Sequence, residues 1–246
     1  MKTREIVLPG DMIDERKGRK LGNGVYEEGD KVFSKFLGVP RVNENELSVI
    51  PLSGTYLPRF GDRVIGVIET VEVSGWFVDI NSPYSAFLPL SEGVDEFVDL
   101  QRSELTRYYD VDDIILCKLS KVTKNKTVQA SMRDFESRKL RNGVLLKVTP
   151  TKIPRIIGKE GSMIMMIKNK TACEIVTGQN GLVWIRGENK EKAIEAILTI
   201  EKESHTIGLT EKIEKMLNED VKQDVNEQLS NPDSWVNKKI SKHLSE

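Results

Sequence analysis

Short runs of β-branched and aromatic residues, each ended by a turn signal, dominate the first half of this chain and restrict it to small β structures. The first two runs are residues 32–36 and 47–51, with Gly38-Val39-Pro40 between them. They predict a small N-terminal β domain over residues 1–57. Five short strands separated by turns are typical of a small barrel, so we expect a five-stranded barrel over residues 58–133. Its strands are predicted at residues 64–73, 76–80, 86–88, 114–119 and 127–131.

The hydrophobic pattern changes after residue 133. A strand is expected at residues 143–148, and apolar residues recur at helical spacing within residues 162–170. Two further strands, 174–177 and 182–186, flank Gly178-Gln179-Asn180-Gly181, whose Asn-Gly pair predicts a hairpin turn because both positions tolerate positive φ. The amphipathic segment 191–203 predicts a helix packed on the sheet. We therefore expect an α+β domain over residues 134–209.

The segment after residue 209 is expected to begin with a helix that has Thr210 as its N-cap and ends near residue 218. Beyond residue 220 the sequence is polar and is interrupted by Asn231-Pro232-Asp233. Terminal segments of this kind are often loosely attached. We expect residues 210–246 to form a C-terminal helix and a mobile tail.

Composition excludes several classes of function. The 246 residues include 37 Lys and Arg against 38 Asp and Glu, so no strong net charge selects a partner. No apolar run approaches the ~20 residues of a membrane helix, and the first residues lack the apolar region of a signal peptide, which favours the cytoplasm and no membrane contact. Cys117 and Cys173 lie in apolar stretches, and His205 and His243 stand apart from any ligand cluster. We expect buried thiols, no metal site and no cofactor.

The sharpest motif is Gly158-Lys159-Glu160-Gly161, which lies before the helix predicted from Ser162. In a KH domain, a Gly-x-x-Gly loop joins two helices and clamps the backbone of about four nucleotides. Glycine permits this close approach, and the N–H groups at the start of the next helix favour a phosphate. The elements that follow the loop have the order of a type I KH domain. We expect RNA to contact Arg155, Ile157, Gly158, Lys159, Glu160, Gly161, Ser162 and Lys168, with Lys152 as a weaker candidate.

The barrel segment carries a second resemblance. Gly61-Asp62-Arg63-Val64-Ile65-Gly66 and Ser74-Gly75-Trp76-Phe77-Val78-Asp79-Ile80 resemble the S-one-type OB domain, which binds single strands by stacking bases on exposed aromatic residues. Strand alternation turns Trp76 inward and Phe77 outward, so Phe77 is the expected stacking residue. Ser74 and Pro89 stand where many such domains carry an aromatic residue and a histidine, which predicts a weaker site. The barrel cations expected to assist are Lys118, Lys121, Lys124, Lys126 and Arg133.

The predicted domain order is a β domain, an S-one barrel and one KH domain. This order resembles that of the archaeal exosome cap proteins of the ribosomal RNA processing protein four type. The resemblance rests on Val7-Leu8-Pro9-Gly10-Asp11, the segment 51–62, the Gly-x-x-Gly loop, Gly178-Gln179-Asn180-Gly181, and Ser204-His205 followed by Gly208-Leu209-Thr210. It implies a non-catalytic subunit that captures single-stranded RNA. Three such subunits would sit on a hexameric ring of phosphorolytic ribonuclease subunits, which other cap proteins can share, and would guide the RNA 3′ end into the pore. The N-terminal β domain would dock on the ring.

Three other functions are open to the sequence alone. The chain could be a structural adaptor of the ring without RNA contact, although an adaptor has no use for a Gly-x-x-Gly loop. It could be an S-one and KH factor of transcription or translation, although such factors usually differ in module number or order. A metal-dependent nuclease would need paired carboxylates, for which Asp110, Asp112 and Asp113 form the only dense acidic group.

Overall fold

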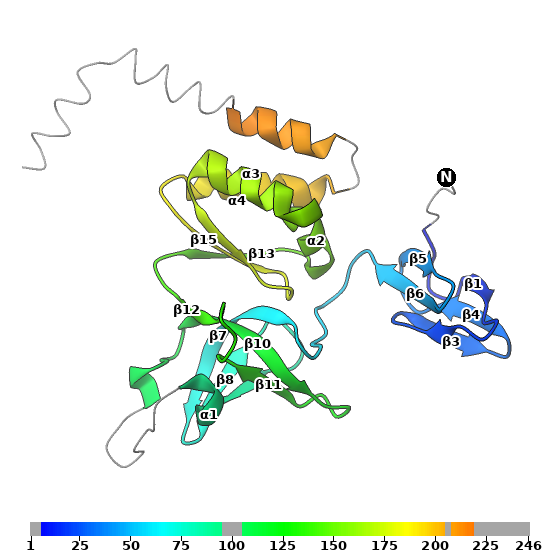
Figure 1. Ribbon diagram of the computed structural model, residues 1–246, viewed down its shortest axis with the longest axis horizontal. Helices are drawn as coiled ribbons and strands as arrows, with labels where there is room; N and C mark the ends of the chain where they lie inside the picture. Colours follow the sequence, from blue (N-terminus) through cyan, green and yellow to red (C-terminus); the bar gives the residue numbers. More distant parts are fainter. Residues whose placement is uncertain (1–5, 95–104, 205–207, 219–246) are drawn as a thin grey trace, which may run out of the picture. The chain divides into compact units, whose positions relative to one another are not determined.

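A computed structural model describes residues 6–94, 105–204 and 208–218 (Figure 1). By its contacts the chain divides into two compact units. The first contains residues 1–140 together with 147–153 and 178–182, and the second contains residues 141–146, 154–177 and 183–246. Within the described ranges, no helix is long and apolar enough to cross a membrane.

The N-terminal domain consists of two small three-stranded sheets. One has the order β1-β4-β3, and the other has the order β2-β6-β5. Val25 and Val32 from the first sheet and Leu47 and Val49 from the second form the shared core. The strands are β1 (Met12–Glu15), β2 (Lys20–Leu21), β3 (Val25–Glu28), β4 (Lys31–Ser34), β5 (Gly38–Val42) and β6 (Glu46–Pro51). The sequence predicted only β4 and β6, because the other strands are short or polar.

Five strands form the barrel, as predicted. They are β7 (Arg63–Glu72), β8 (Gly75–Asp79), β9 (Ala86–Pro89), β10 (Ile114–Val122) and β11 (Val128–Ser131). Their order is β11-β9-β8-β7-β10, and pairing between β10 and β11 closes the barrel. A short strand, β12 (Arg138–Leu140), extends the sheet beside β10. Trp76, Val78 and Ile80 are fully buried in the core, which confirms the inward face predicted for β8.

The connection between β9 and β10 contains α1 (Leu90–Gly93) and a single turn of 3₁₀ helix, η1 (Leu105–Arg107). Leu105 lies in the barrel core, where Tyr108 and Tyr109 also pack. The described part of this connection therefore packs on the barrel through η1 and the residues that follow it, while residues 95–104 lie outside the described ranges.

The C-terminal domain has the element order expected of a type I KH domain. It runs through β13 (Val144–Lys147), η2 (Pro150–Lys152), α2 (Ile153–Ile157), η3 (Lys159–Gly161), α3 (Ser162–Thr171), β14 (Glu174–Thr177), β15 (Leu182–Arg186) and α4 (Lys190–Lys202). The sheet order is β13-β15-β14, and Figure 1 shows α3 and α4 together on one side of it. The fold class predicted from the sequence, β domain, OB barrel and KH domain, is confirmed.

One local prediction needs correction. The last described helix covers residues 209–218, so Thr210 lies inside it and is not its N-cap. The hairpin predicted from the Asn-Gly pair is present between the antiparallel strands β14 and β15, and of that pair only Gly181 has positive φ. The tail beyond residue 218 and both histidines lie outside the described residues.

Candidate nucleic-acid interface

The Gly-x-x-Gly loop joins α2 to α3 through a strained backbone. Gly158 has φ +78°, and a Cβ at this position would lie 2.7 Å from Met163 Cβ, so only glycine fits. Gly161 has φ +79° but faces open space, so its conformation and not crowding requires glycine. Crowding within the protein therefore requires glycine at position 158, whereas at position 161 the backbone conformation requires it. Glu160 between them also has positive φ, 53°, at a cost of about 1 kcal/mol.

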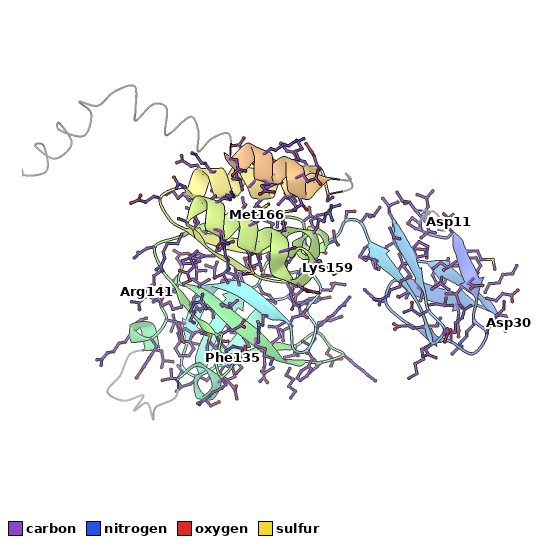
Figure 2. The ribbon with its side chains drawn as sticks, turned by 45° about the horizontal axis from the view of Figure 1, so that its top comes forward. Asp11, Asp30, Phe135, Arg141, Lys159 and Met166 are labelled. Atoms are coloured by element: carbon purple, nitrogen blue, oxygen red, sulfur yellow. The ribbon has the colours of Figure 1, made fainter. Side chains whose placement is uncertain are left out.

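The loop presents its polar groups to solvent. Lys159 and Glu160 are exposed, and Figure 2 shows Lys159 at the loop end of α3. No side chain caps α3, whose first N–H, that of Ser162, bonds to the Lys159 carbonyl. The positive end of the helix dipole lies at the loop and favours an anion there. Ile156 and Ile167 are fully buried on either side of the loop and anchor its ends. Ile157, one of the residues expected to contact RNA, is half-buried.

The cations predicted around the loop differ in their surroundings. Neither Lys159 nor Lys168 has an ion-pair partner among the described residues. Lys168 is half-buried and lies six residues after Ser162, the first residue of α3. At a rise of ~1.5 Å per residue, Lys168 lies ~9 Å along the helix axis from Ser162. Arg155 is exposed on α2, while Lys152 is half-buried in η2, and both already interact with other residues. Lys159 is therefore the most available charge beside the loop.

On the barrel, Phe77 is accompanied by a second aromatic residue that sequence reasoning missed. Phe77 is 39% exposed, and its ring centroid lies 5.1 Å from that of Phe87, its cross-strand partner on β9. Ala86 and Leu88 on either side of Phe87 are fully buried, so Phe87 points outward. The same alternation that identified Phe77 could have identified Phe87. Two neighbouring rings on an outer barrel face offer a larger stacking surface than one.

Three of the five predicted barrel cations keep their charge available. Within the described residues Lys121 and Lys124 have no carboxylate partner, and both are exposed. Lys126 lies with its ammonium 5.9 Å from the ring centroid of Tyr84, an interaction that leaves the charge unneutralised. These residues lie in or beside the turn between β10 and β11.

The other two predicted cations have structural partners. Lys118 forms an ion pair with Asp134 at 3.3 Å. The guanidinium of Arg133 donates hydrogen bonds to the carbonyls of Ser91 at 2.7 Å and Val94 at 3.2 Å. Arg133 therefore fastens α1 to β11, and Lys118 carries less free charge than Lys121.

The acidic group that suggested a nuclease forms a turn before β10. Asp113 accepts the backbone N–H of Asp110 at 2.7 Å and pairs with Lys139. Asp112 has φ 67° and donates its N–H to the Ile68 carbonyl at 3.0 Å. These contacts assign the turn a structural role. Among the described residues, no group of three or more His, Cys, Asp or Glu is placed to hold a metal ion.

The Gly178-Gln179-Asn180-Gly181 turn is packed against β7. Asn180 is fully buried, and its Nδ2 donates to the carbonyls of Ile65 at 2.7 Å and Ile80 at 2.8 Å. Its Oδ1 accepts the N–H of Ile65 at 3.3 Å. Gln179 exchanges two hydrogen bonds of 2.9 Å with the backbone of Arg63. The turn is therefore structural and presents no nucleotide ligand at Asn180.

Comparison with known proteins gives three domain matches in the order of the fold. Residues 4–53 match the exosome RNA binding protein RRP4 N-terminal domain, residues 55–121 match the RRP4 S1 domain, and residues 143–191 match a KH domain. The exosome complex component Rrp4 of Pyrococcus furiosus is 43% identical over 222 residues, which cover 88% of this chain and 84% of that protein. The chain belongs to the Rrp4 family.

Further relatives agree with this assignment. The Rrp4 of Picrophilus torridus is 41% identical, and the match covers 88% of this chain and 94% of that protein. A crystal structure named for an exosome complex RNA-binding protein has 30% identity and a TM-score of 0.64, and it covers 70% of this chain and 99% of its own. Rrp4 proteins are RNA-binding exosome components and not catalysts. The sequence resemblance to archaeal exosome caps is confirmed.

Proposed function

We propose that this Rrp4-family chain captures single-stranded RNA and guides its 3′ end into a hexameric ring of phosphorolytic ribonuclease subunits for 3′ to 5′ degradation. The loop between α2 and α3 is the observation that carries the proposal. It combines a backbone in which Gly158, Glu160 and Gly161 have positive φ, an uncapped helix N-terminus and the exposed Lys159. A sugar-phosphate backbone is the ligand that this combination fits best.

The outer face of the barrel supports a second, weaker contact with single-stranded RNA. Phe77 and Phe87 provide rings for bases, and Lys121, Lys124 and Lys126 provide charge for phosphates. Stacking of this kind does not itself depend on the identity of the base.

The N-terminal domain supports docking on the ring. Among the described residues it exposes more large apolar side chains than it buries in its small core. The exposed ones are Ile6, Leu8, Met12, Leu21, Phe36, Leu37, Val42, Ile50 and Leu57. Apolar surface of this extent is characteristic of protein interfaces. We assign it to the ribonuclease subunits of the ring.

The remaining parts of the proposal concern assembly. Three copies around one pore would raise the effective concentration of weak RNA sites, and other cap proteins can share the ring. We propose domain boundaries that divide the chain into residues 1–57, 58–133, 134–209 and 210–246, and the three family matches follow the same order over residues 4–191. We propose that the protein captures and guides RNA in the cytoplasm.

RNA binding is tested with a double substitution in the loop and a matched double substitution elsewhere in the same domain. Lys159→Asp combined with Glu160→Asp should weaken binding of a labelled single-stranded RNA at low salt, measured by fluorescence anisotropy. The control is Lys190→Asp with Glu191→Asp, an exposed Lys-Glu pair at the start of α4 that undergoes the same charge change. Equal affinity of both variants and the wild type would remove the loop clamp from the proposal.

Salt dependence separates RNA capture from a purely structural adaptor. Each phosphate contact to a single strand should contribute about -0.7 to the slope of log affinity against log salt. A flat response would favour the adaptor. Purification of the tagged protein after nuclease treatment, followed by mass spectrometry, tests the ring itself. Recovery of two phosphorolytic ribonuclease subunits supports the proposal, whereas recovery of ribosomes or RNA polymerase contradicts it.

A further inference from the structure

Strand register places four outward residues of the barrel in one continuous row. Phe77 on β8 is opposite Phe87 on β9, Phe87 is opposite Gln129 on β11, and Gln129 is opposite Lys121 on β10. Neighbouring strands lie ~4.8 Å apart, so the row from Phe77 to Lys121 is ~14 Å long. The row runs across the strands and passes over the β10–β11 pairing that closes the barrel.

All four side chains lie on the outer surface. Val128 and Ala130, on either side of Gln129, are buried in the core, so alternation directs Gln129 outward. The register of β10 shifts between Leu119 and Lys121, and this irregularity leaves Lys121 exposed although Leu119 is fully buried. The row therefore consists of two aromatic rings, one carboxamide and one ammonium group, in that order.

The two polar members of the row have unused hydrogen-bonding groups. Within the described part of the chain, neither the carboxamide of Gln129 nor the ammonium of Lys121 has a hydrogen-bond or ion-pair partner. Gln129 is half-buried and is the register partner of Phe87 on the neighbouring strand. A carboxamide presents one acceptor and two donor hydrogens, which can pair with the polar edge of a nucleobase.

We propose that Gln129 reads the edge of the base that stacks on Phe87, while Lys121 contacts the adjoining phosphate, so that the barrel face prefers some bases over others. This inference rests on the proposed RNA-binding function. Stacking on Phe77 and Phe87 is indifferent to base identity, and Lys121 recognises only charge. Gln129 is the member of the row whose chemistry distinguishes bases.

The test compares the full chain with the Gln129→Met variant, which keeps side-chain length and removes both hydrogen-bonding groups. Affinities for short homopolymers of A, C, G and U are measured by fluorescence anisotropy. The wild type should bind its strongest homopolymer more tightly than its weakest, and Gln129→Met should reduce that ratio by about three- to tenfold, the value of one or two hydrogen bonds. Binding of the weakest homopolymer should stay nearly unchanged. An unaltered ratio, or equal binding of all four homopolymers by the wild type, would overturn the inference.

Three further variants separate the possible outcomes. Asn43→Met removes an exposed amide from the N-terminal domain and should leave the ratio unchanged. Gln129→Glu keeps the shape but removes the donors, so it should reorder the preference among bases. Lys121→Gln should weaken all four homopolymers alike and lower the salt slope by about 0.7. Wild-type binding that is absent or independent of salt would refute the proposed RNA-binding function, whereas salt-dependent binding with unchanged discrimination in Gln129→Met would refute only the role of Gln129.

Discussion

Replacing Asn180 by alanine should destabilise the barrel more than any change to an exposed residue of the same turn. The carboxamide of Asn180 is fully buried and serves three backbone groups, namely the N–H and C=O of Ile65 and the C=O of Ile80. Asn180→Ala leaves all three without their partner in the interior. At about 1 kcal/mol for each net hydrogen bond, the free energy of unfolding should fall by about 3 kcal/mol. This is about a hundredfold in the unfolding equilibrium.

Two measurements check this prediction. Urea unfolding gives the change in stability, and the fluorescence of the buried Trp76 reports on the barrel. Hydrogen exchange of the Ile65 amide reports directly on the lost acceptor. Gln179→Ala is the control, because its exposed side chain accepts a single hydrogen bond, from the Arg63 N–H at 2.9 Å. A loss for Asn180→Ala no larger than that of Gln179→Ala would refute the energetic role of the buried carboxamide.

The Asn180→Asp variant adds a pH test of the same reasoning. A carboxylate here would face the Ile65 and Ile80 carbonyls without a hydrogen to donate, in a fully buried position. Both effects favour the protonated acid, so the pKa of the new Asp in the folded protein should exceed its unfolded value of about 3.9. The protonated acid supports the fold below the unfolded pKa, and this support is lost as pH rises through the higher folded pKa. The stability deficit of Asn180→Asp should therefore grow between acid and neutral pH, and a deficit independent of pH would contradict the argument.

Three further predictions concern single sites. Phe87→Ala should weaken single-stranded RNA binding by roughly 5- to 100-fold in anisotropy titrations, as expected for the loss of one stacked base, and an unchanged affinity would exclude Phe87 from the interface. Burial raises the pKa of the Cys117 thiol to about 12. The contribution of the neutral thiol to the free energy of unfolding should therefore be complete below pH 9 and should be lost as pH rises toward 12. In urea unfolding, Cys117→Ala should reduce this loss of stability at high pH. The Arg19 guanidinium, which lies 2.8 Å from the Asp14 carboxylate, holds the pKa of that carboxyl below its usual range, so Arg19→Ala should raise the value in an NMR titration.

The barrel and the KH domain could be predicted from sequence because their patterns are strong and local. Alternation over β8 identified both its core face and the outward Phe77, and helical spacing identified α3 and α4. The N-terminal strands were mostly missed, because β2 has two residues and β3 ends in two glutamates. Helix α2 was missed because it has only five residues and includes Pro154.

The candidate site was only partly visible in the sequence for a topological reason. The loop around Gly158 lies in one continuous motif, so its position could be predicted. The row that contains Gln129 and Lys121 depends on parallel pairing of β11 with β9 and on the register shift in β10, which no local pattern reveals. For Asn180, the Asn-Gly pair indicated a turn, but the structure uses its carboxamide for hydrogen bonds to residues 115 and 100 positions away.

The packing of the turn at Asn180 also limits where this chain can be truncated. Strand β8 stops pairing with β7 at Val67, and the backbone groups of Arg63 and Ile65 are then met by Gln179 and Asn180. A fragment ending at residue 140 would leave this stretch of β7 as an open strand edge, which is a template for pairing with another chain. Such a fragment should self-associate. The hairpin turn between β14 and β15 thus protects the edge of a barrel strand that is encoded more than a hundred residues earlier.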